Sequence, residues 1–163
     1  MEIEICELPA ISVVGMEGGA KPGHNPACAL WEKANARFGE VDGLALRDEN
    51  GAPVGIWGAM SDLSRSFLPW EDGFSQGLYL AGVQVPPEAL PPEGWVKWTL
   101  PSFACLRVRA EGDYGAAFRA GLDELGRRGL TLAGAVQECQ RPAEGGQLYL
   151  FFPFKRLREE AST

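Results

Sequence analysis

The chain has 163 residues, about one domain, and its 45% hydrophobic and 23% charged residues are typical of a globular protein, which excludes disorder, collagen and coiled coil. The 15 basic and 22 acidic side chains give a formal net charge of -7, so a nucleic-acid backbone would be repelled and direct nucleic-acid binding is not expected. The longest apolar run, Leu148 to Phe154, is too short to span a membrane, and the N-terminus lacks the regions of a signal peptide. We therefore expect a cytoplasmic protein that makes no membrane contact.

The first half of the chain predicts strand, helix, strand, strand. Alternating and β-branched residues indicate one strand from about residue 3 to 16, kinked at Pro9. Asn25 and Pro26 form a typical helix start, and apolar residues at helical spacing then extend the helix over 26–38. Two strands follow, Val54 to Gly58 and Leu78 to Val85.

The second half predicts the same order of elements. A proline-rich segment over 86–94 lacks the amide donors of a sheet interior and is expected to connect the two halves. The segment 95–109 is strand-like with a break at Pro101, and a helix capped by Asp113 should end near Gly129. The last two strands are predicted over 130–139 and 147–154.

This repetition predicts an internal duplication within a single domain. Val13 to Gly18 matches Arg107 to Gly112, and Gly77 to Leu80 matches Gln147 to Leu150. The first repeat is expected over about 1–86, the second over about 95–155, and a charged tail over 156–163. The expected fold is α+β, with two strand-helix-strand-strand units related by a pseudo-two-fold axis. Edge-to-edge pairing would place both helices on one face of an antiparallel sheet and leave a ligand cleft at the seam.

Common catalytic and metal-binding motifs are missing from the sequence. It contains no nucleophile elbow, no phosphate-binding glycine loop, no dinucleotide fingerprint and no His-Glu-x-x-His. The four cysteines are far apart and are expected to be reduced and mostly packed, and neither a metal site nor a cofactor is predicted. The single histidine, His24, is expected to be an exposed loop residue rather than a catalytic one.

Aromatic side chains are the main candidates for ligand contact. Six of them lie on predicted strands near the seam, although core packing is the more frequent role of such residues: Trp57, Tyr79, Trp98, Phe103, Tyr149 and Phe151. Trp31 lies on the helix face expected to dock on the sheet. Trp70 lies in a polar loop, where a large aromatic residue has less structural reason to exist, so a ligand-covering role and a purely structural role both stay open.

Glu138 is the acidic residue of interest because it interrupts a predicted apolar strand. A carboxylate in an aromatic crevice is costly to desolvate unless it meets a cation or a hydrogen-bond donor. Glu138 is therefore a candidate for recognising cationic, lipophilic molecules. The alternative is an edge-strand carboxylate that points into water.

The strand Leu78 to Val85 and the proline-rich connector are followed by Leu100 to Ala104 leading to Ala110-Glu111-Gly112, a helix, and the closing Leu150 to Phe154. Together these segments resemble the GyrI-like effector-binding domain, which is shared by ligand domains of AraC-type and multidrug-sensing regulators and by stand-alone gyrase-inhibitor proteins. The similar segments cover nearly the whole chain.

The resemblance implies a small-molecule-binding domain with an acidic residue in the strand before the last one and with aromatic walls. Glu138 matches that acidic position, with a shift to Gln137 as an alternative, whereas the tyrosine expected two residues later is Gln140. Some stand-alone relatives use this glutamate to hydrolyse cyclopropane-bearing molecules, so Glu138 is also the catalytic candidate if the chain is a hydrolase. No helix-turn-helix segment is evident, so a self-contained transcription factor is not expected.

Three functions remain open on the sequence. The favoured one is a binding module for hydrophobic cationic ligands, in which Trp57, Trp98 and Tyr79 stack on the ligand and Glu138 neutralises its charge. The second is the hydrolase. The third is an interaction with a protein partner, such as gyrase or a regulator, through the acidic surface.

Overall fold

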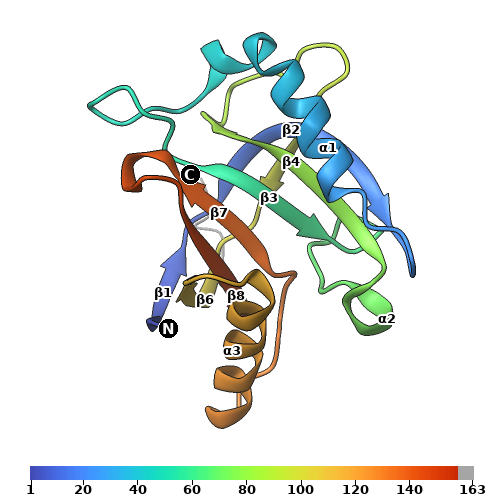
Figure 1. Ribbon diagram of the computed structural model, residues 1–163, viewed down its shortest axis with the longest axis vertical. Coiled ribbons are helices and arrows are strands. Elements are labelled where there is room, and N and C mark those ends of the chain that lie inside the picture. The colour runs from blue at the N-terminus through green and yellow to red at the C-terminus, as the bar shows by residue number, and fades with distance from the viewer. Residues whose placement is uncertain (158–163) are drawn as a thin grey trace, which may run out of the picture.

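The computed structural model describes residues 1–157 and contains an eight-stranded sheet in which all neighbouring strands are antiparallel (Figure 1). The strands are β1 Ile3–Leu8, β2 Ile11–Ala20, β3 Ile56–Ser61, β4 Gly77–Val85, β5 Val96–Leu100, β6 Phe103–Arg109, β7 Gln137–Arg141 and β8 Gln147–Arg156. The helices are α1 Ala27–Ala36, the short α2 Glu71–Phe74 and α3 Tyr114–Arg127. The α+β class and the antiparallel sheet are confirmed, while most of the predicted charged tail lies outside the described residues.

Prolines divide two of the predicted strands. The strand expected over 3–16 is β1 and β2, separated by Pro9, and the strand-like segment 95–109 is β5 and β6, separated by Pro101. Proline lacks the amide donor that a continuous strand needs, and each break sends the chain across the sheet. The strand order is β1-β6-β8-β7-β3-β4-β2-β5, so β1 and β5 form the two edges.

This strand order is palindromic when β1 to β4 are exchanged with β5 to β8, and the halves meet where β3 pairs with β7. One of the sequence matches behind the predicted duplication is out of register with this arrangement. Tyr79 packs in the cluster under α1, whereas Tyr149 belongs to the cluster on the opposite face of the sheet. Because side chains alternate between faces, these two tyrosines are not structural equivalents.

α3 begins at the predicted cap Asp113, whose side chain accepts a hydrogen bond from the amide of Gly115 at 3.0 Å. α1 begins one residue later than predicted, because Pro26 rather than Asn25 is its N-cap residue; the Asn25 side chain accepts a hydrogen bond from the amide of Ala27 at 2.9 Å. Both helices cover the same face of the sheet (Figure 1), α1 over β2 and β4 and α3 over β6 and β8. No helix in residues 1–157 is long and apolar enough to cross a membrane.

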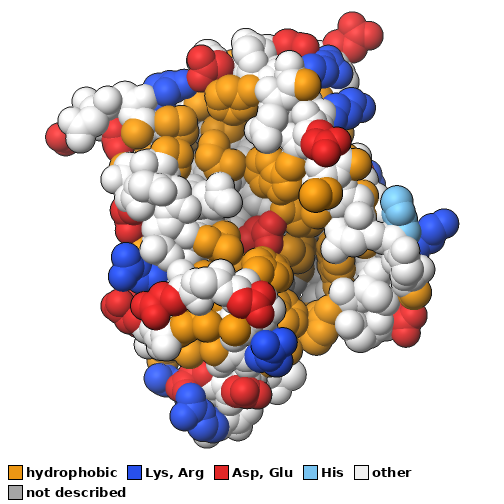
Figure 2. All heavy atoms as spheres, viewed as in Figure 1, with side chains coloured by type: hydrophobic (Ala, Val, Ile, Leu, Met, Phe, Trp, Pro, Cys, Tyr) orange, Lys and Arg blue, Asp and Glu red, His pale blue; other side chains and the backbone are white. Residues whose placement is uncertain are grey.

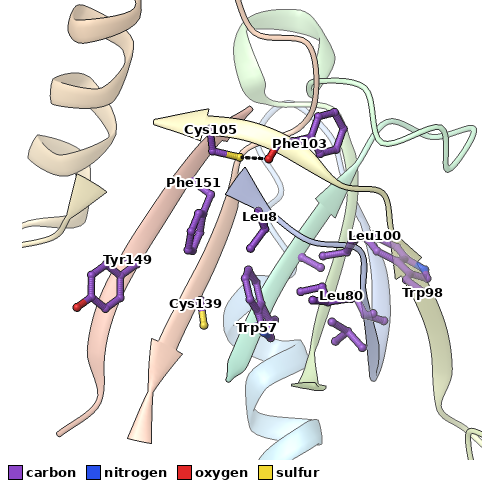
Figure 3. Packing of buried hydrophobic residues seen from close by; sticks show 13 residues of the cluster. Leu8, Trp57, Leu80, Trp98, Leu100, Phe103, Cys105, Cys139, Tyr149 and Phe151 are labelled. Carbon is purple, nitrogen blue, oxygen red and sulfur yellow. Dashed lines mark hydrogen bonds between the residues drawn. The ribbon is translucent and has the colours of Figure 1, made fainter. Parts of the chain in front are cut away.

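The other face of the curved sheet carries its own apolar cluster (Figure 3), which contains Trp57, Trp98, Phe103, Tyr149 and Phe151. Trp57 and Phe151 pack with their ring centroids 5.6 Å apart. Apolar side chains therefore pack on both faces of the sheet. All four cysteines are free thiols; Cys105 and Cys139 are buried within this cluster, Cys6 packs against it, and Cys28 is exposed.

The strand predicted over 130–139 begins only at Gln137. Before it, the amide of Ala133 donates to the Pro153 carbonyl and the amide of Ala135 to the Phe67 carbonyl, both at 2.9 Å. These partners lie on a strand and on a loop, so the segment has no continuous ladder partner. The segment leads into β7, which pairs with β3 at the seam.

Gly121 determines how closely α3 approaches the sheet, because a Cβ atom there would collide with the ring of Phe152 on β8. We expect Gly121→Ala to destabilise the protein by about 1–3 kcal/mol through overpacking. Gly126 on the same helix faces open space, so Gly126→Ala should stabilise it by about 0.5–1 kcal/mol. Chemical denaturation of both variants tests this; equal effects would contradict the packing argument.

Candidate functional site

A cavity of about 420 Å³ opens between α1 and α3 on the helix-covered face of the sheet. Figure 2 shows this face hollowed, with hydrophobic side chains surrounding an acidic one. Met60, Tyr79 and Glu138 line the cavity from the strands β3, β4 and β7, and α3 lines it with Tyr114 and Phe118. The cavity therefore lies over the seam between the two halves, and its size is within the roughly 300–1,000 Å³ of small-molecule pockets.

Gly58 allows the two polar groups at the base of the cavity to meet. Glu138 on β7 pairs with Gly58 on β3, while Tyr79 reaches over from β4, on the other side of β3. A Cβ atom at position 58 would collide with both the Tyr79 hydroxyl and the Glu138 carboxylate. The absence of a side chain at this position leaves room for the Tyr79 hydroxyl to donate a hydrogen bond to Glu138 Oε1.

Trp31 extends this contact into a chain of three groups. Its indole Nε1 donates to the Tyr79 hydroxyl at 2.9 Å, and that hydroxyl in turn donates to Glu138. The phenol thus uses both its acceptor and its donor capacity and is held in one orientation. Tyr79 is only 2% exposed, so this geometry is fixed by packing as well as by hydrogen bonds.

Burial raises the pKa of Glu138 above its ordinary value, and the hydrogen bonds from Tyr79 and Tyr114 act in the opposite direction. Burial likewise raises the pKa of Tyr79 and of Tyr114, and the nearby Glu138 carboxylate raises both further. Both phenols therefore remain protonated and available as donors. The carboxylate is the group whose charge is most costly in this cavity.

The rim of the cavity comes from the loop between β3 and β4 and from the first turns of α3. Trp70 lines the cavity, and its indole donates to the Leu78 carbonyl at 3.0 Å. Phe74 packs edge-on against Phe118 with centroids 5.4 Å apart, which joins this loop to α3. Arg119 also lines the cavity and is exposed. The rim is largely aromatic and partly open to water.

The structure brings together three of the nine predicted site residues and places a fourth beside them. Glu138, Tyr79 and Trp70 line the cavity, and Trp31 contacts Tyr79. Gln137, the alternative to Glu138, is 3% exposed, and its side-chain amide bonds the backbone of Met60 at 2.7 and 2.8 Å. This geometry favours Glu138 as the acidic residue of the site.

Contrary to the prediction, the structure places the other five aromatic residues away from this cavity. They lie in the cluster on the opposite face of the sheet and line no part of this cavity: Trp57, Trp98, Phe103, Tyr149 and Phe151. Two of their indoles are bound there, Trp57 Nε1 to Gln84 at 3.0 Å and Trp98 Nε1 to Glu17 at 2.7 Å. Successive side chains along a strand point to opposite faces of the sheet, so residues 57 and 58 lie on different faces. Because this sheet is apolar on both faces, the sequence does not show which face the helices cover.

Sequence reasoning missed Tyr114, Phe118, Phe74 and Arg119 as cavity residues. Tyr114 and Phe118 lie on the predicted helix after Asp113, and Tyr114 is 39% exposed at the cavity. One sequence feature could have identified Tyr114, namely its position directly after the cap Asp113. The end of a helix rarely reaches the centre of a core, so an aromatic residue there is a candidate for a partly exposed position. His24 is exposed in a turn and does not line the cavity.

No protein-family model and no curated protein matches the chain, but solved structures share its fold. SAV2435, solved bound to tetraphenylphosphonium, is similar with a TM-score of 0.63 and 17% identity over 95% of this chain and 94% of that one. The C-terminal domain of EcmrR is similar with a TM-score of 0.61 and 10% identity over 96% and 98%. An integron cassette protein from Vibrio cholerae reaches 0.57 and 15% identity over 94% and 95%. The chain therefore shares the fold of these solved structures, which is consistent with the GyrI-like effector-binding domain that its sequence resembles.

The raised pKa of Glu138 makes the stability of the folded protein depend on pH. The folded state holds the carboxyl proton more tightly than the unfolded chain, so the stability contributed by this group is complete below its ordinary pKa of 4.5 and is lost as pH rises through the raised value. Glu138→Gln cannot undergo this loss. The melting temperature of the variant minus that of the wild type should therefore increase as pH rises above the ordinary pKa of 4.5.

Differential scanning calorimetry across this pH range measures the effect, with each kcal/mol expected to shift the melting temperature by about 2–4 °C. Glu111→Gln, at an exposed position in the turn before α3, is the matched control and should show no such trend. A constant difference for Glu138→Gln would mean that the carboxyl is not perturbed.

Proposed function

We propose that this chain binds hydrophobic, cationic small molecules in the cavity between α1 and α3. The observation that carries the proposal is the Glu138 carboxylate, which lies at the base of an otherwise largely aromatic cavity and whose pKa burial raises. A buried carboxylate is destabilised unless a positive charge compensates it. A lipophilic cation supplies that charge and also fills the apolar space around it.

The aromatic walls support the same ligand class. The faces of Trp and Tyr rings attract cations, and this attraction strengthens when water is excluded. Tyr79 and Trp70 belong to the lining, and Phe74 and Phe118 close one side of the opening. Apolar contact area would supply most of the affinity, and Glu138 would select for positive charge.

The likeness to SAV2435 adds support from outside the chain. That protein, which has a similar fold at 17% identity, was solved in complex with tetraphenylphosphonium, a hydrophobic cation. Tetraphenylphosphonium is a suitable probe for the present chain, because it combines a single positive charge with four aromatic rings.

The test compares tetraphenylphosphonium with the neutral triphenylphosphine oxide in wild type and in Glu138→Gln. Removing one partner of a buried charge pair is strongly destabilising, so the variant should lose at least about ten-fold in affinity for the cation. Its affinity for the neutral compound should change by less than about three-fold, because apolar contacts are unaltered. Isothermal titration calorimetry measures both.

Glu111→Gln has the same change of net charge and serves as the control for long-range electrostatics. It should bind both compounds like the wild type. Equal losses for the cation and the neutral compound in Glu138→Gln would show that Glu138 does not read charge, and the proposed ligand class would be wrong.

A second candidate function is hydrolysis of a neutral molecule with a strained, carbonyl-activated three-membered ring. The observation that favours it is again the raised pKa of Glu138, which makes the carboxylate a stronger general base. In this reaction Glu138 takes a proton from water as the water oxygen bonds to a ring carbon. The ring carbon–carbon bond breaks, and its electron pair moves to the carbonyl oxygen, which then takes up a proton.

A spirocyclopropyl dienone incubated with the protein tests this candidate, with ring opening followed by absorbance. General-base catalysis predicts that Glu138→Gln lowers turnover at least about 100-fold while the compound still binds. Turnover that is equal in the wild type and the variant, or no turnover above the rate in buffer, would reject the hydrolase.

A further inference from the structure

A second cavity, of about 280 Å³, opens on the same face of the sheet as the main one. It lies between α1, the segment that follows it and the seam strands. The residues of its lining that matter for recognition are Trp31, Asn35, Phe38, Ile56, Trp95 and Gln140. None of the proposed functions uses this cavity.

Strand geometry places the two cavities side by side. On β7, Glu138 lines the main cavity and Gln140, two residues later and on the same face, lines the second. On β3, Met60 lines the main cavity and Ile56 the second, again on one face. The two spaces therefore follow one another along the seam.

The indole of Trp31 marks the division between them. Trp31 lines the second cavity, and its Nε1 donates at 2.9 Å to the hydroxyl of Tyr79, which lines the main one. The hydrogen bond holds the ring in place, so the cavities are separate compartments in this conformation. A molecule in the second cavity would have its own contacts and its own selectivity.

The chemistry of the second cavity differs from that of the main one. Among the described residues that line it, none is ionised, whereas Glu138 and Arg119 line the main cavity. A charged molecule would lose its hydration there without gaining a counter-charge, which is unfavourable. The primary amides of Asn35 and Gln140 offer both donors and acceptors, and Trp31, Phe38 and Trp95 offer aromatic surface. This combination suits a neutral aromatic ring that carries an amide.

One wall of the second cavity is held rigidly. Trp95 is only 5% exposed, and its Nε1 donates to Glu40 Oε1 at 3.2 Å. Glu40 in turn accepts from the guanidinium of Arg37 at 2.8 and 2.7 Å. A wall fixed in this way needs little ordering when a ligand binds, which reduces the entropic cost of binding.

From these observations we propose that the second cavity is a separate binding site for a small, neutral aromatic amide. Its volume is just below the roughly 300 Å³ at which pockets for drug-sized molecules begin, so a single ring with one polar substituent is the expected size. The proposal does not depend on cation binding in the main cavity.

Benzamide is the probe, and benzylammonium, of nearly the same shape but positively charged, is the matched comparison. Binding is followed through the indole N–H resonances of ¹⁵N-labelled protein, assigned by Trp→Phe variants. Benzamide should shift the signals of Trp31 and Trp95, and its affinity should exceed that of benzylammonium by at least about ten-fold.

Gln140 provides two variants that spare the fold, because it is exposed at the rim of the cavity. Gln140→Trp should cover the opening and lower benzamide affinity at least about ten-fold, and Gln140→Ala should lower it about three- to ten-fold by removing one hydrogen-bonding group. Neither should change tetraphenylphosphonium affinity by more than about two-fold.

Displacement separates this site from the main one. Saturating tetraphenylphosphonium should leave benzamide bound. Competition between the two compounds, benzamide affinity unaltered by both Gln140 variants, preference for benzylammonium, or no shift of Trp31 and Trp95 up to the solubility limit would overturn the proposal. If tetraphenylphosphonium fails to bind at all, the proposed function fails while the benzamide measurements still decide this one.

Discussion

The hydrogen bond from Tyr79 to Glu138, made over the bare backbone of Gly58, is the constraint on which the main cavity depends. Three neighbouring strands contribute one residue each, so the contact exists only when the two halves of the sheet are joined at β3 and β7. Trp31 then fixes the phenol from the helix above. A carboxylate that the sequence places within a strand becomes, through this arrangement, the central polar group of an apolar cavity.

The net charge of the chain and the Glu138 carboxylate act on ligands in the same direction. The chain carries a formal net charge of -7, and a field of this sign raises the local concentration of cations near the surface. Glu138 concentrates negative charge inside the cavity, where water screens it poorly. In the proposed function, long-range attraction and the local charge of Glu138 would therefore favour the same sign of ligand charge.

Much of the fold followed from local signals, whereas the face that each strand buries did not. The start of α3 was predictable because Asp113 is a strong cap, and the start of α1 was predictable to within one residue from Asn25 and Pro26. Glu138 was identifiable as a charged residue within a predicted strand. Trp57 was misplaced because a strand covered on both faces has no polar side to mark its orientation. The pairing partners of β1 and β5 could not be predicted either. A proline indicates where a strand ends, but it does not indicate which strand the next segment pairs with.

The exchange of edge strands has a consequence for how the chain folds. β1 is the first strand of the first half but pairs with β6 of the second, and β5 is the first strand of the second half but pairs with β2 of the first. Each half thus completes its sheet with a strand from the other, and neither can reach its final structure alone. Contacts between distant parts of the chain slow folding, so this topology implies slow, highly cooperative acquisition of the native state, with both lobes forming or melting together.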